Sequence, residues 1–141
     1  MMVLDVNVLL TFTIPQEYAH HVAQRALNHW IDSNTQIVAP PLLHAEFTAV
    51  MRKLVYTQRL SQEHADEILH AILQLPIYIF YNAQIYSRAL TLATQFNQPR
   101  AYDTQYLAVT EYFDCTLWTA DERFVNRLRL PSVQLIQSFS V

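Results

Sequence analysis

The residues best suited to chemistry in this sequence are four carboxylic acids, Asp5, Glu46, Asp103 and Asp121. Asp5 ends an apolar run near the N-terminus, and Asp121 lies just after another short apolar run. Carboxylates that lie close together repel one another and raise each other's pKa values. A hard divalent cation such as Mg²⁺ or Mn²⁺ removes this conflict and supports in-line hydrolysis of a phosphodiester by water. If the four acids meet in one pocket, they predict a metal-dependent phosphodiesterase.

The other two acids lie on amphipathic stretches with helical spacing. Glu46 lies three residues after Leu43 and four before Val50, so its face of the helix turns largely inward. An unpaired carboxylate buried there costs several kcal/mol or takes up a proton. Asp103 begins a second amphipathic stretch. A shared metal site would explain both positions.

Each acid also has a structural interpretation that needs no chemistry. Asp103 is suited to cap its own helix. Thr119 and Glu122 fit a capping box with Thr119 at the N-cap, in which the helix dipole favours Asp121. Glu46 has a possible ionic partner in Arg100. These interpretations need a separate explanation for each acid, whereas a metal site needs one.

The elements that must position these acids are predicted by alternating apolar runs and amphipathic stretches. Strands separated by helices favour an α/β domain, with a mainly parallel five-stranded sheet and helices on both faces in three layers. Sites in such sheets form beyond the carboxyl ends of the strands, where the strand order reverses, so Asp5 and Asp121 converge if their strands are neighbours there. No linker divides the chain, and we expect one domain over residues 1–141. The expected strands are 2–4, 37–39, 77–80, 116–118 and 133–136, and the expected helices are 17–31, 42–56, one capped by Ser61 and ended by Pro76, 83–96, 103–113 and 120–128.

Composition excludes several function classes. The 141 residues include no glycine, which excludes the phosphate-binding loop and the dinucleotide fingerprint. The net charge of −3 argues against a passive nucleic-acid coat. Cys115 is the single cysteine, so a reducing, cytoplasmic location is expected. No apolar run approaches the roughly 20 residues of a membrane span, so no membrane association is expected.

The segments around the four acids resemble those of PIN-domain nucleases, and within that family the VapC-type toxins of VapBC toxin–antitoxin modules. The resemblance covers the whole chain, although the absence of glycine and the loop at 98–100 are particular to this sequence. The matching segments are LDVNVL (4–9), PLLHAE (41–46), AYD (101–103) followed by YLA (106–108), and TAD (119–121) followed by Phe124.

The resemblance implies a PIN-like fold and a metal-dependent endoribonuclease. It implies that Asp5, Glu46, Asp103 and Asp121 are the catalytic and metal-binding acids around Mg²⁺ or Mn²⁺. Asn7 and Thr119 would orient them through hydrogen bonds. It further implies RNA products with a 5′-phosphate and a 3′-hydroxyl, a homodimer, and a small VapB-like antitoxin that silences the enzyme.

Four basic residues follow the proposed acids and are candidates for binding RNA phosphates: Arg52, Lys53, Arg123 and Arg127. The alternative for each is a solvated helix face. For the whole chain, one alternative function is a catalytically inactive PIN-like binding module. Another is a phosphatase with an aspartate nucleophile, but that chemistry needs a second Asp where this chain has Asn7, and a distal lysine, whereas the only lysine is Lys53.

Overall fold

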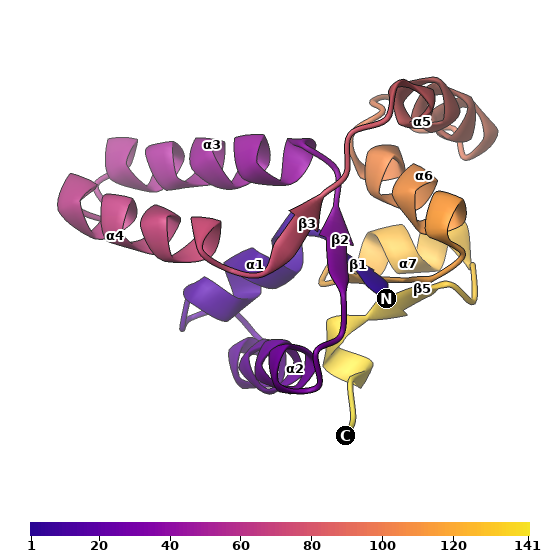
Figure 1. The fold of residues 1–141 in the computed structure, drawn as a ribbon. Coiled ribbons are helices and arrows are strands. Elements are labelled where there is room, and N and C mark those ends of the chain that lie inside the picture. The colour runs from indigo at the N-terminus through magenta and orange to yellow at the C-terminus, as the bar shows by residue number, and fades with distance from the viewer.

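A single sheet of five parallel strands, ordered β3-β2-β1-β4-β5, forms the centre of the computed structural model, which describes all 141 residues (Figure 1). The first strand, β1, lies in the middle and pairs with β2 on one side and β4 on the other. The predicted α/β class and the five strands are confirmed, and every strand pair is parallel. The strands are β1 (Met2–Leu4), β2 (Ile37–Ala39), β3 (Ile77–Ile79), β4 (Thr116–Thr119) and β5 (Val133–Leu135).

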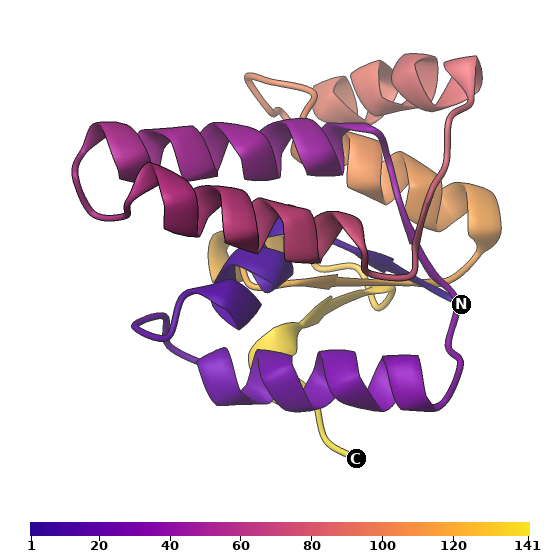
Figure 2. The same cartoon turned by 60° about the vertical axis from the view of Figure 1, so that its left-hand side comes forward.

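Helices cover both faces of the sheet. In Figure 1, α1, α3 and α4 lie to the left of the sheet and α5, α6 and α7 to the right, and Figure 2 shows the antiparallel pair α3 and α4 from a second side. The helices are α1 (Val6–Thr13), α2 (His20–Asp32), α3 (Leu42–Tyr56), α4 (Gln62–Leu73), α5 (Ala83–Gln95), α6 (Asp103–Phe113) and α7 (Glu122–Leu128), and a 3₁₀ turn, η1, follows at Ile136–Ser138.

All six predicted helices are present, with small differences at their ends. Ser61 caps α4 as expected, because its hydroxyl accepts a hydrogen bond from the backbone N–H of His64 at 3.1 Å. The helix predicted at 17–31 begins at His20 instead of residue 17, because Ala19 has a left-handed backbone that interrupts helical geometry. The helix predicted to begin at residue 120 starts at Glu122.

The helix α1 was not predicted from the sequence. This helix has the sequence VNVLLTFT and buries Val6, Val8, Leu9 and Thr11. Apolar and β-branched residues stand on nearly all its sides, so it has no amphipathic pattern. A helix with such a composition is stable only when neighbouring elements cover it, and α1 contacts α2, α3 and β4.

The buried core is built around the central strands. Val3, Leu4, Val38 and Leu117 are fully inaccessible to solvent, as expected for parallel strands covered on both faces. Asp5 comes directly after this apolar strand and is itself 4% exposed. The sheet therefore carries the first candidate acid into the interior.

Without glycine, other residues take the left-handed backbone that helix ends commonly require. Five such residues follow helices: Asn34, Gln58, Asn97, Asp114 and Arg129, with φ between 48° and 59°. This conformation costs an L-residue about 1–2 kcal/mol. No helix of the structure is long and apolar enough to span a membrane.

Candidate active site

Asp5 lies at the carboxyl end of the central strand and also caps α1. Its backbone N–H donates to the carbonyl of Trp118 at 3.0 Å, which ties the end of β1 to β4. Its Oδ2 accepts hydrogen bonds from Thr119 Oγ1 at 2.5 Å and from Asn7 Nδ2 at 3.2 Å. The pKa of this carboxyl is raised from 3.8 to about 7, chiefly by burial and further by the charges of Asp103 and Glu46, while the two hydrogen bonds oppose the shift.

Asp121 is joined to Asp5 through Thr119. The Thr119 side chain is fully buried, donates to Asp5, and accepts from the backbone N–H of Asp121 at 3.1 Å. Strands β1 and β4 are neighbours in the sheet, as convergence of the two acids at the switch point requires, and their ends bring Asp5 and Asp121 together. The predicted capping box is wrong in detail: Asp121 is itself the N-cap of α7, and its Oδ1 accepts from the N–H of Phe124 at 3.1 Å.

Glu46 approaches the same region from α3. Its Oε1 accepts a hydrogen bond of 2.7 Å from the hydroxyl of Tyr106, which is 1% exposed. The suggested ion pair with Arg100 is absent, because the only ion pair in the structure joins Arg88 and Glu111. Burial raises the pKa of Glu46, and the negative charge of Asp103 adds to the effect, while the bond from Tyr106 lowers it.

Asp103 stands in the first turn of α6, on the side of the sheet opposite α3. Tyr102 occupies the N-cap position and no side chain caps this helix, so the proposed capping role of Asp103 is wrong. Burial raises the pKa of Asp103, the charge of Asp121 adds to this, and Arg127 opposes it. Arg127 also donates a short hydrogen bond to Gln98 Oε1.

The four acids are therefore electrostatic neighbours without forming a closed cluster. The negative charges of Glu46 and Asp103 raise the pKa of Asp5. The charge of Asp103 raises the pKa of Glu46, and the charge of Asp121 raises the pKa of Asp103. No group of three or more His, Cys, Asp or Glu side chains lies close enough to form a ready-made metal site. Without a cation, like charges favour separation, and each acid but Asp103 is held by a hydrogen bond from its own neighbour.

Tyr106 is a site residue that the sequence analysis missed. It entered the sequence analysis only within the segment YLA (106–108) of the family resemblance, with no role of its own. A buried tyrosine hydroxyl nearly always needs a hydrogen-bond partner, so the inward position of Tyr106 could have signalled a polar partner, which the structure shows to be Glu46. Burial, together with the charges of Asp5 and Glu46, raises the pKa of Tyr106 far above its usual value, so it remains a hydrogen-bond donor.

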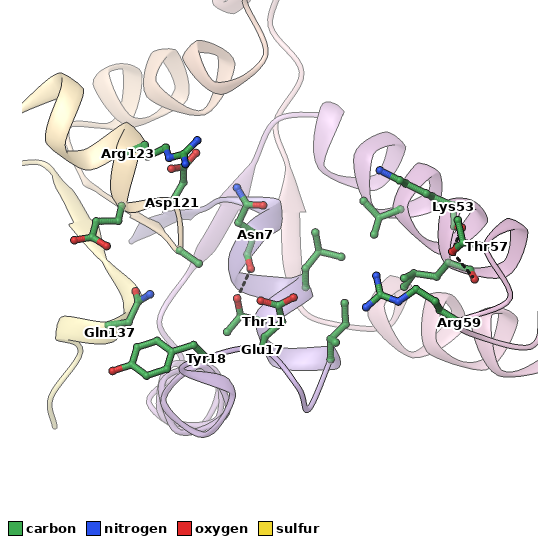
Figure 3. Close-up of a pocket in the computed structure, with 16 residues that line it drawn as sticks. Asn7, Thr11, Glu17, Tyr18, Lys53, Thr57, Arg59, Asp121, Arg123 and Gln137 are labelled. Carbon is green, nitrogen blue, oxygen red and sulfur yellow. Dashed lines mark hydrogen bonds between the residues drawn. The ribbon is translucent and has the colours of Figure 1, made fainter.

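A cavity of about 750 Å³ opens beside Asn7 and Asp121 (Figure 3). Its walls come from α1, the loop before α2, the second half of α3, and the start of α7. Lys53 and Arg123 line it, together with Arg59, which the sequence analysis had not singled out.

The other two candidate phosphate-binding residues lie elsewhere. Arg52 does not line the cavity, and its guanidinium stands over the ring of Tyr56 at 5.6 Å. Arg127 does not line it either and bonds to Gln98 near Asp103. The four basic residues proposed from the sequence thus divide into two that face the cavity and two that do not.

Comparisons with known proteins agree with this architecture. A family model described as the PIN domain matches residues 3–135. No curated protein matches the sequence. A toxin–antitoxin complex from Klebsiella pneumoniae is similar, with 17% sequence identity and a TM-score of 0.68 over 100% of both chains. VapC20 from Mycobacterium tuberculosis, which is a sarcin–ricin loop cleaving toxin, has 12% identity and a TM-score of 0.67 over 89% of this chain and 94% of that one. PAE2754 from Pyrobaculum aerophilum has 17% identity and a TM-score of 0.74 over 97% of this chain and 91% of that one. At these identities the likeness shows the fold alone.

Proposed function

Because this chain belongs to the PIN-domain family, we propose that it is a metal-dependent endoribonuclease and the toxin of a type II toxin–antitoxin pair. The observation that carries the proposal is Asp5, a carboxylate 4% exposed at the end of the central strand, within electrostatic range of two further acids. A carboxylate in such a place is costly to the fold, and a bound cation gives it a use.

The chemistry of the donor set fits Mg²⁺ or Mn²⁺. All four candidate ligands, Asp5, Glu46, Asp103 and Asp121, offer carboxylate oxygens, which hard cations prefer. The carboxyl of Asp5 has a raised pKa because of burial and its acidic neighbours, and a bound cation would oppose this shift by stabilising the ionised carboxylate. When bound, the metal supplies Lewis acidity, which lowers the pKa of an attacking water and neutralises charge that develops on the phosphate.

The chain's own residues orient this donor set. The side chains of Thr119 and Asn7 both donate hydrogen bonds to Asp5 Oδ2, which fixes the orientation of the carboxylate. Its other oxygen, Oδ1, accepts only a weak contact of 3.5 Å from the backbone N–H of Asn7. Tyr106 holds one oxygen of Glu46 and leaves the other without a protein partner. Each acid thus keeps acceptor capacity for a cation, as a metal site requires.

Cleavage of RNA by the purified protein tests the activity. We expect hydrolysis with Mg²⁺ or Mn²⁺, no hydrolysis with EDTA, and loss of hydrolysis in Asp5→Asn. Asp66→Asn is the matched control, because Asp66 is an exposed acid on α4 that does not line the cavity and bonds only to Gln62. Products with a 5′-phosphate and a 3′-hydroxyl are expected. Activity that survives both EDTA and Asp5→Asn would refute the metal mechanism.

The partner and the assembly are part of the same proposal. One similar structure is a toxin–antitoxin complex, which supports a small VapB-like antitoxin encoded next to this chain. We propose that the chain works in the cytoplasm as a homodimer, with residues 1–141 as one domain. Growth arrest on expression that co-expression of the neighbouring gene relieves would support the toxin role. A chain that binds the partner but cleaves no RNA would instead be a binding module.

A further inference from the structure

A hydrogen bond between two side chains links the helix that follows Asp121 to the loop that leads to Asp103. Arg127, on α7, donates this bond to Oε1 of Gln98, which lies between α5 and α6. We propose that Gln98 is a positioning residue, which holds the guanidinium of Arg127 away from the carboxylate of Asp103 and so keeps that carboxylate open to the divalent cation. The inference rests on the proposed function, since it takes Asp103 as a ligand of the metal.

Asp103 and Arg127 carry opposite charges within electrostatic range, yet they are not paired with each other. The charge of Arg127 opposes the rise in the pKa of Asp103. The only ion pair in the structure joins Arg88 and Glu111, so no nitrogen of Arg127 lies within ion-pair distance of the Asp103 carboxylate. Asp103 is partly buried, where charges attract each other more strongly than in bulk water. Some other contact must therefore hold the long, exposed side chain of Arg127 in place.

The backbone of Gln98 is fixed by the way in which α5 ends. Asn97 has a left-handed conformation with φ 51°. Its N–H bonds to the carbonyl of Thr94 at 3.2 Å, and the N–H of Gln98 bonds to the carbonyl of Ala93 at 2.7 Å. This pair of bonds is a Schellman motif, which stops the helix and turns the chain. Pro99 follows directly and restricts the backbone of Gln98 further.

The side-chain amide of Gln98 is oriented as well. Its Nε2 donates to the backbone carbonyl of Phe96 at 2.9 Å. A guanidinium has donors and no acceptor, so only the amide oxygen can face Arg127. The bond to Phe96 directs the nitrogen away and leaves Oε1 for the guanidinium. Gln98 is thus an acceptor whose position is set before Arg127 binds to it.

The loss of this acceptor would release Arg127 toward the acid. Asp103 accepts no hydrogen bond from its neighbours, unlike Asp5, Glu46 and Asp121. Its oxygens are therefore available to a released guanidinium, which binds carboxylates through paired N–H donors. A divalent cation would then have to displace the arginine before it could bind Asp103. The structure thus contains an inhibitory ion pair that Gln98 prevents from forming.

Calorimetric titration with Mn²⁺ near neutral pH measures this effect without RNA. We expect Gln98→Ala, which keeps the backbone bonds of the loop, to bind Mn²⁺ about tenfold more weakly than the wild type, as is typical for loss of a residue that supports a metal ligand. Gln98→Glu keeps an acceptor for Arg127 and should bind at least as tightly as the wild type. A crystal structure of Gln98→Ala grown in EDTA should show Arg127 paired with Asp103. Thermal melts followed by circular dichroism check that each variant is folded.

A second substitution separates the release of Arg127 from a general disturbance of the loop. Gln98→Ala/Arg127→Gln removes the released cation and should restore at least the wild-type affinity for Mn²⁺. Gln98→Ala/Arg129→Gln is the matched control, because Arg129 is exposed at the end of the same helix and carries the same charge. The affinity of this control should stay as low as that of Gln98→Ala, since Arg127 remains in place.

The results distinguish this inference from the proposed function. Wild-type affinity in Gln98→Ala would overturn the inference, as would no recovery in Gln98→Ala/Arg127→Gln or equal recovery in the Arg129 control. Each of these results leaves the proposed function intact, because the wild type still binds Mn²⁺. Failure of the wild type to bind Mn²⁺ would overturn both.

Discussion

The pH dependence of stability tests the buried carboxylate of Asp5 directly. Its pKa is raised from 3.8 to about 7, chiefly because burial disfavours the charged form. The folded state therefore holds this proton more tightly than the unfolded state does. Between about pH 4 and 7 the unfolded chain releases the proton first, so the free energy of unfolding falls as pH rises through this window. Below pH 4 both states are protonated and the penalty vanishes, and above about pH 7 it is complete.

The size of the effect follows from the same values. The interval from 3.8 to about 7 corresponds to about 4 kcal/mol. Burial also raises the pKa of Glu46 and Asp103, and both add to the fall in the same direction. The contribution of Asp5 is therefore isolated by comparison with Asp5→Asn, which keeps an oxygen acceptor for Thr119 and removes the ionisable group.

Urea unfolding of the two proteins in EDTA, at several pH values from 4 to 8, measures this difference. We expect the wild type to lose about 2–4 kcal/mol relative to Asp5→Asn across the range, with the change centred between pH 4 and 7. The variant should be the more stable of the two at pH 8. Parallel curves for both proteins would mean that Asp5 does not carry a raised pKa in the fold, and the argument from its burial would fail.

Three further changes test other parts of the structure. Tyr106→Phe removes the hydroxyl that holds Glu46 but keeps the ring in the core, so we expect Mn²⁺ affinity by calorimetry to fall about 10- to 100-fold while the chain stays folded. Asp103→Asn should leave the metal-free free energy of unfolding in urea unchanged or raise it, because its pKa is raised and it caps no helix; a loss of more than about 1 kcal/mol would restore the capping role. Gln58 has a left-handed backbone with φ 59°, so Gln58→Gly should raise the free energy of unfolding in urea by about 0.5–1 kcal/mol. A lower free energy of unfolding would show that glycine's greater unfolded-state entropy outweighs the removal of the backbone strain.

Much of the fold was predictable because its signals are local. The apolar run at β1 and the Ser61 cap of α4 each involve a few neighbouring residues, and both are present in the structure. The helix α1 was not predictable in this way, because its apolar residues have no preferred side and only its neighbours make it stable. The start of α2 was misplaced since nothing in the sequence marks Ala19 as left-handed.

The candidate site was predictable to the level of residue type and strand end. The order of parallel strands fixes where Asp5 and Asp121 lie, and periodicity turns Glu46 inward. Hydrogen-bond partners separated by long stretches of chain were not predictable by spacing alone. Tyr106 reaches Glu46 from a helix 60 residues later, and no local pattern records that contact. The hydrogen bond from Thr119 to Asp5, by contrast, was expected from the family resemblance, which implied that Thr119 orients the acids.

Stability and the proposed chemistry meet at Asp5. A neutral residue such as asparagine could cap α1 at that position without the cost of burying a charge, so the fold alone gives no reason for an ionisable side chain there. The hydrogen bonds from Thr119 and Asn7 lower its pKa but do not cancel the effect of burial, since the pKa remains about 7. Near neutral pH this carboxyl therefore divides its population between a proton and a negative charge. A divalent cation competes with that proton, so metal binding should release protons and stabilise the fold together. Asp5, whose burial weakens the metal-free fold, is thus also a residue through which a cation would strengthen it.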